Sequence, residues 1–127
     1  MTASALVMGV VGILASFLPQ EILSYIEVRT TGIPLLLMQI SGALYLAFAM
    51  MNWMTRLNLI GGIYGRPIAM GNFIHFFIGG ITIVKGILID PNSAITWIAG
   101  SVYSVFAILF GLVLFRHPGS KETALKN

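Results

Sequence analysis

The chain has 127 residues, of which 57% are hydrophobic and only 9% are charged, whereas a typical soluble domain is about 25% charged. Four acidic and seven basic residues cannot cover the polar surface of a soluble domain, but a surface that faces lipid can be apolar. The net charge of +3 does not indicate nucleic-acid binding, because the basic residues stand singly between apolar runs. With no cysteine, disulfides and thiolate sites are excluded.

Four apolar runs without a charged residue are long enough to cross a bilayer, which takes about 20 helical residues. They predict spans at 2–20, 30–55, 67–84 and 91–115. Pro19 is expected to end the first span and Pro67 to open the third, since proline is tolerated in the first turn of a helix. The sequence therefore predicts an all-α integral membrane four-helix bundle, with residues 1–119 as one domain and 120–127 as a polar tail.

The three linkers differ in character. Residues 21–29 are short and amphipathic, which is typical of a helix lying along the lipid headgroups. Residues 56–66 hold three glycines and stay apolar, so we expect them to follow the membrane surface. Residues 85–91 are expected to form a tight turn.

Orientation follows from the distribution of Lys and Arg, which are enriched on the cytoplasmic side of membrane proteins. The side that holds the two termini and the second linker carries Arg56, Arg66, Arg116, Lys121 and Lys126. The other side carries only Arg29 and Lys85. This distribution predicts an N-in/C-in topology.

Two helices carry stripes of small residues, which allow close approach of neighbouring helices in a membrane. The stripes are Ala5, Gly9, Gly12 and Ser16 in the first span, and Gly100, Ser104, Ala107 and Gly111 in the fourth. They predict helix contacts within one chain or between two chains.

The second and third spans carry polar residues at helical spacing. The two stripes are Gln39, Gly42, Tyr45, Ala49, Asn52 and Arg56, and Asn72, His75, Gly79, Thr82 and Gly86. A polar side chain in hydrocarbon needs a partner or water, so we expect the two faces to meet inside the bundle. Gln39, Tyr45 or Thr82 is the expected partner of His75, which lies near the bilayer midplane.

This arrangement supports two interpretations. In the first, a cavity between the second and third spans binds a small lipophilic or anionic ligand. Its candidate residues are His75, Asn72, Arg66, Arg56, Asn52, Tyr45 and Gln39. The arginines would hold a headgroup, a carboxylate or a quinone oxygen, and His75 could relay a proton because imidazole titrates near neutral pH. In the second, the polar residues only form hydrogen bonds that hold the helices together. The arginines then only fix the orientation of the chain in the membrane.

Several kinds of chemistry lack their residues in this chain. Haem with two axial histidines needs a second histidine at the depth of His75, and His117 lies beyond the fourth span. A zinc site lacks ligands, and the four carboxylates stand in linkers or in the tail. We therefore predict no catalytic residue, metal or cofactor. An intramembrane enzyme would need an acid or a metal that the chain does not supply alone.

The segment AFAMMNWMTRLNLIGGIYGRPIAMGNFIHFFIGG, residues 47–80, resembles small bacterial membrane proteins of the DoxX-like kind. The residues that carry the likeness are Asn52-Trp53, Gly61-Gly62-Ile63-Tyr64, Arg66-Pro67, Gly71-Asn72 and His75-Phe76. The resemblance implies a four-helix protein of the bacterial inner membrane. Since some relatives are small subunits linked to quinone-coupled oxidoreductases, it also implies a quinone-facing or accessory role.

Two functional hypotheses follow. The chain is a subunit or docking partner of a larger membrane assembly, or a homo-oligomer, which docks through its small-residue faces. Alternatively, it is a binding or transport protein that uses the cavity lined by His75. Its surroundings are the lipid bilayer in both cases.

Overall fold

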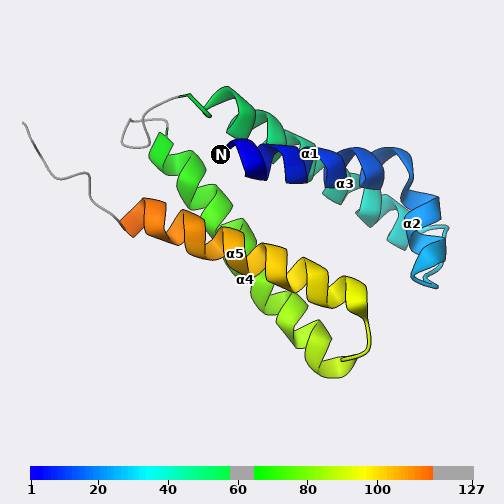
Figure 1. Ribbon diagram of the computed structural model, residues 1–127. Helices are drawn as coiled ribbons and strands as arrows, with labels where there is room; N and C mark the ends of the chain where they lie inside the picture. The colour runs from blue at the N-terminus through cyan, green and yellow to red at the C-terminus, as the bar shows by residue number, and fades with distance from the viewer. Residues whose placement is uncertain (58–64, 116–127) are drawn as a thin grey trace, which may run out of the picture. The chain divides into compact units, whose positions relative to one another are not determined.

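The computed structural model of the chain describes residues 1–57 and 65–115. Within these ranges 85% of the residues are helical and none is in a strand, which confirms the all-α prediction. The helices are α1 (Thr2–Phe17), α2 (Pro19–Tyr25), α3 (Ile33–Met54), α4 (Gly65–Ile89) and α5 (Ala94–Phe115) (Figure 1). Residues 58–64 of the predicted second linker, Arg116 and the predicted tail at 120–127 lie outside the described residues.

The length and composition of the helices are compatible with a membrane protein. Helices α3, α4 and α5 are each long and apolar enough to cross a bilayer. Helices α1 and α2 pass the same test only as a pair, and the pair is bent by 93°. Among the described residues the structure therefore has three helices that could span a membrane, or four if the bent pair counts as one.

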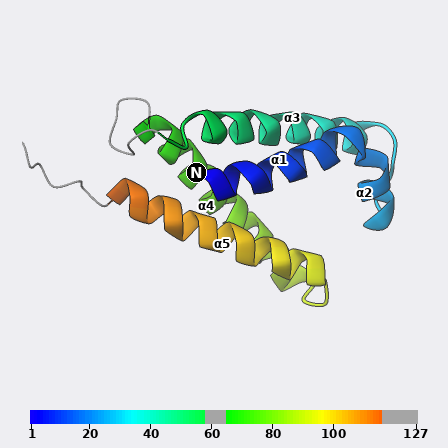
Figure 2. The ribbon, with the colours of Figure 1, turned by 45° about the horizontal axis from the view of Figure 1, so that its top comes forward.

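The chain divides into two compact units, Met1–Asn58 and Leu59–Asn127. In the first unit α1 lies along α3, and the short α2 contacts both. In the second unit α4 packs against α5. Both views show these helices side by side within their units (Figures 1 and 2).

In the first unit, α1 and α3 approach each other where both carry glycine. A Cβ added at Gly12 would lie 2.8 Å from the backbone nitrogen of Leu46, and a Cβ at Gly42 would lie 2.7 Å from the backbone nitrogen of Ser16. Further contacts along the antiparallel pair join Met1 with Thr55, Met8 with Asn52, and Gly9 with Ala49. The small-residue stripe of the first span thus packs within the chain.

The predicted end of the first span is wrong. Helix α1 stops at Phe17, and Pro19 opens α2 instead of closing α1. The reason is that proline fits the first turn of a helix, where its missing N–H has no partner to lose. Its 16 residues make α1 about 24 Å long. Helix α2 overlaps the amphipathic segment predicted at 21–29, and the chain then turns into α3 with Gly32 at a φ of 73°.

In the second unit, the small residues of α5 face α4. A Cβ added at Gly100 would lie 3.1 Å from Ile87 Cδ1, and one at Gly111 would lie 3.2 Å from Phe73 Cε2. Phe76 of α4, which is 1% exposed, fills the centre of the contact. The small-residue stripe of the fourth span therefore also packs within the chain.

The turn between α4 and α5 differs from the predicted one at 85–91. Lys85 lies inside α4, which continues to Ile89, because lysine favours the helix and its stem can extend to the membrane surface. Pro91 belongs to the turn and not to the helix: Trp97 Nε1 donates a hydrogen bond of 2.9 Å to its carbonyl oxygen. Helix α5 begins at Ala94, where Ser93 Oγ accepts the Thr96 N–H at 3.4 Å as an N-cap.

Candidate functional site

A histidine and a tyrosine form a polar pair between α4 and α5. His75 and Tyr103 both lie near the middle of their helices. A hydrogen bond of 3.3 Å joins Tyr103 Oη and His75 Nε2, and the ring centroids are 5.6 Å apart. Both side chains are half-buried. Ionisable residues in membrane-spanning segments are rare and mostly functional, so this pair is the leading candidate site.

Tyr103 is a site residue that the sequence analysis missed. Of the expected partners of His75, Thr82 is wrong, because Thr82 Oγ1 donates a hydrogen bond of 3.0 Å to Ile78 O in its own helix. Tyr45 and Gln39 belong to the other unit, and their pairing with His75 stays a prediction. The spacing along the helix could have identified Tyr103. It lies three residues after Gly100 and four before Ala107, so it shares the face of α5 that carries the small residues.

The His75–Tyr103 pair rests on an aromatic cluster. The Phe76 ring stacks on Phe106 and Phe110 at centroid distances of 4.8 and 5.9 Å. It also meets both members of the polar pair edge-on, His75 at 5.1 Å and Tyr103 at 5.2 Å. Packed rings exclude water from this side, and a polar contact is stronger where the local dielectric is low. The cluster therefore holds the pair in one position.

Asn72 shares the predicted face with His75. It is fully buried one turn earlier in α4, and its Nδ2 donates a hydrogen bond of 2.8 Å to Ile68 O. Gly79, one turn after His75, contacts the Tyr103 ring. Within the predicted stripe of the third span, His75 and Gly79 therefore lie against Tyr103 of α5, whereas Thr82 is exposed.

Part of the polar stripe of the second span lies against α1, a neighbour that the sequence analysis did not predict. Gly42 and Ala49 contact α1, and the fully buried Asn52 directs Nδ2 to Met8 Sδ of α1 at 3.7 Å. These three residues were expected to face the third span, which belongs to the other unit, and that expectation stays a prediction. Tyr45 is half-buried in α3 and Gln39 is exposed.

The two arginines of the predicted entrance are exposed. Arg56 folds back on Trp53: Nη1 donates a hydrogen bond of 2.7 Å to Trp53 O, and the guanidinium lies 3.8 Å from the centre of the indole. Arginine and tryptophan together are typical of a membrane–water interface. Arg66 is the second residue of α4. Because Arg56 and Arg66 belong to different units, an entrance formed by both stays a prediction.

No group of three or more His, Asp or Glu side chains within 1–57 and 65–115 is arranged to hold a metal ion. Comparison with protein families, with curated proteins and with solved structures gave no match. The chemistry of the site must therefore be argued from its own residues.

Proposed function

We propose that the chain is an integral membrane protein that binds a small lipophilic molecule with a hydrogen-bonding head, and that His75 and Tyr103 contact this head. The observation that carries the proposal is the hydrogen-bonded pair in the middle of two apolar helices. Keeping two such side chains in hydrocarbon is costly, and a function at this position accounts for the cost.

The pair has the chemistry for a carbonyl or hydroxyl ligand. A neutral imidazole has one donor and one acceptor nitrogen, and a phenol can donate and accept. The present separation of 3.3 Å is at the long end for a hydrogen bond, so a ligand oxygen can compete for it at small cost. A quinone, which joins two carbonyl oxygens to an apolar tail, fits this chemistry, and the DoxX-like resemblance of residues 47–80 points to the same ligand class.

For the membrane arrangement we propose four spans in the bacterial inner membrane, with both termini in the cytoplasm. The bent pair is then the first span, in which α1 crosses and α2 lies along the outer headgroups. The exposed Glu21 and the buried Leu23 of α2 support this placement. The five basic residues expected inside, against two outside, support the orientation.

A second candidate function is that of an accessory subunit or docking partner in a larger membrane assembly, or in a homo-oligomer. It is favoured by the outer faces of the helices, which expose large apolar side chains along their length. Examples are Leu6 and Val10 of α1, each 58% exposed, and Ile98 of α5, 66% exposed. The small-residue stripes are used inside each helix pair, so a partner would bind these outer faces instead.

One purification tests both candidates. The protein would be purified from its native membrane, at native levels, in mild detergent, and its bound lipophilic molecules extracted and identified by mass spectrometry. We expect a ligand in the wild type that is lost in His75→Ala and reduced in Tyr103→Phe. Thr82→Val is the matched control, since Thr82 bonds only to the backbone of its own helix among the contacts described.

The outcomes separate the candidates. A ligand retained equally in all four proteins, or found in none, would contradict binding at His75. A second protein that copurifies in fixed ratio with the wild type and with His75→Ala alike would instead support the accessory role.

A further inference from the structure

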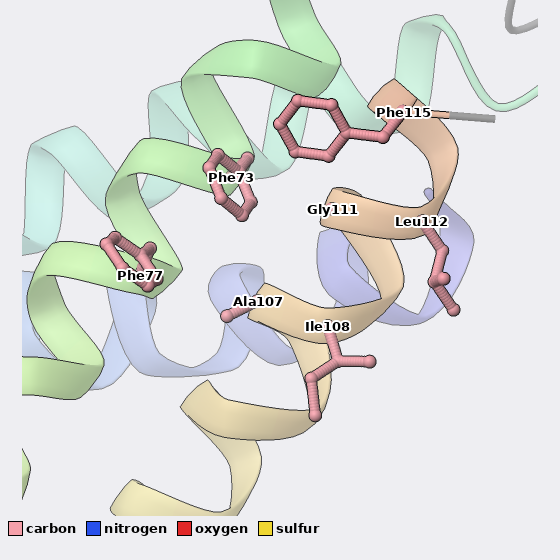
Figure 3. A pocket seen from close by; sticks show the side chains of 7 residues that line it. All are labelled: Phe73, Phe77, Ala107, Ile108, Gly111, Leu112 and Phe115. Atoms are coloured by element: carbon pink, nitrogen blue, oxygen red, sulfur yellow. The ribbon is translucent and has the colours of Figure 1, made fainter. Parts of the chain in front are cut away.

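A furrow runs between α4 and α5, away from the His75–Tyr103 pair. One part of it has a volume of about 440 Å³ (Figure 3) and an adjoining part about 350 Å³. The first part is lined by Phe73, Phe77, Ala107, Ile108, Gly111, Leu112 and Phe115. The second is lined by Phe76, Phe77, Gly80, Ile81, Val84, Lys85, Ser104, Ala107 and Ile108. The two parts share Phe77, Ala107 and Ile108 and so form one feature.

Helical geometry puts the furrow on the opposite side of the α4–α5 contact from the polar pair. At 3.6 residues per turn, Phe73, Phe77 and Val84 point to one side of α4, and His75 and Gly79 point to another. Neither His75 nor Tyr103 lines the furrow, although Phe76, which lines its second part, contacts both of them.

The floor and the walls of the furrow differ in size. The floor is formed by the small residues Gly80, Ala107 and Gly111, and the walls are formed by aromatic rings and branched side chains. Figure 3 shows Phe73 and Phe77 on α4 facing Ala107 and Gly111 on α5. The walls remain accessible: Phe77 is 49% exposed and Ile108 is 63% exposed.

The furrow is long, narrow and charged at one end. From Phe73 to Lys85 it follows α4 for about 18 Å. Lys85 stands at one end, exposed, four residues before α4 finishes at Ile89. Within the described parts of the chain Lys85 makes no ion pair. A lysine at this place can extend its ammonium group to the headgroup level.

We propose that the furrow binds an acyl chain of an anionic membrane lipid, and that the Lys85 ammonium pairs with the lipid phosphate. Charge complementarity decides the headgroup, since Lys85 is the one charged residue that lines the furrow. Size decides the tail: the two volumes are those of small-molecule sites, whereas a transmembrane helix of a partner is about 10 Å wide. Only apolar side chains and the Ser104 hydroxyl accompany Lys85, which suits a hydrocarbon chain.

The test uses the full chain in bilayers with spin-labelled phosphatidylglycerol or spin-labelled phosphatidylcholine as the probe. Electron paramagnetic resonance reports the fraction of each lipid immobilised on the protein. We expect the wild type to prefer phosphatidylglycerol. Lys85→Met should lower this preference about fivefold, the size expected for one interfacial lysine, and Lys85→Arg should keep it.

A second pair of variants tests the furrow itself. Ile108→Trp fills the furrow from its wall, whereas Leu109→Trp adds the same bulk to a neighbouring residue, 50% exposed, that does not line it. Both positions are on the surface, so both variants should fold. We expect Ile108→Trp to lower the immobilised phosphatidylglycerol and Leu109→Trp to leave it unchanged.

Three results would overturn the proposal. The first is a wild type without preference between the two lipids. The second is a preference of the same size in the wild type and in Lys85→Met or Ile108→Trp. The third is an oligomer that dissociates in Ile108→Trp and not in Leu109→Trp, which would assign the furrow to a second copy of the chain.

Discussion

Gly79 of α4 makes room for the ring of Tyr103 from α5. A Cβ at position 79 would stand 2.5 Å from Tyr103 Cε1, closer than real side chains approach. The same ring reaches His75 Nε2 with its hydroxyl. The glycine therefore sets the position of the tyrosine, and the tyrosine sets the geometry of the candidate site.

Gly79→Ala should displace the Tyr103 ring and break its hydrogen bond to His75. Crowding of this kind costs about 1–3 kcal/mol, and loss of an interhelical hydrogen bond in a membrane costs about 1–2 kcal/mol. We expect a lower midpoint when the purified protein is unfolded by titration with sodium dodecyl sulfate, together with less bound ligand. Gly86→Ala is the control, since its Cβ would lie 3.8 Å from Thr96 Cγ2, an ordinary contact. Equal midpoints for the two variants would contradict the role of Gly79.

Gly42→Ala should destabilise the pair of α1 and α3. Its Cβ would lie 2.5 Å from Ser16 Oγ and 2.7 Å from the Ser16 backbone nitrogen. The backbone cannot rotate away as a side chain can, so the helices must separate, at a cost of about 1–3 kcal/mol. The same detergent titration measures the change. Gly9→Ala, whose Cβ would meet Ala49 Cβ at 3.7 Å, should leave the midpoint close to that of the wild type; an equal loss in both would refute this account of the crossing.

The proposed topology predicts the labelling of single cysteines. The chain contains no cysteine, so each introduced thiol is unique. In intact cells a membrane-impermeant maleimide should label Asn92→Cys, in the turn between α4 and α5. It should label Leu57→Cys, after α3, only once the membrane is permeabilised. The opposite pattern would invert the topology, and labelling of both in intact cells would mean that the spans are miscounted.

The helices themselves follow from hydropathy, but several of their ends do not. The same proline that stops one helix can start the next, and the residues around Pro19 do not reveal which, so the bend after Phe17 was missed. Lys85 was taken as the end of a span because it is charged. A lysine within reach of the headgroups costs the helix little, and α4 continues past it.

The sequence predicted His75 as a site residue and did not predict its hydrogen bond to Tyr103. His75 is conspicuous because a titratable residue stands alone in an apolar span. Tyr103 is not conspicuous, since tyrosine is common in membrane helices and its choice of neighbour depends on which helix packs against which. The pairing of α1 with α3 depends on the close approach at Gly12 and Gly42, and it brings Met8 against Asn52, a contact that the sequence analysis did not predict. The furrow could not be predicted, because the sequence does not show whether an apolar residue lines a groove or projects from the surface.

The most direct test of the proposed function is the nitrogen-15 resonance of the His75 side chain. His117→Gln leaves His75 as the single histidine, so the signal needs no further assignment. The detergent-solubilised protein would be titrated with a short-tailed quinone and, separately, with the same tail on a benzene ring that lacks the oxygens. Our account predicts a saturable shift of the Nε2 resonance with the quinone and none with the benzene analogue. A resonance that stays in place with the quinone, or that moves equally with both compounds, would contradict it.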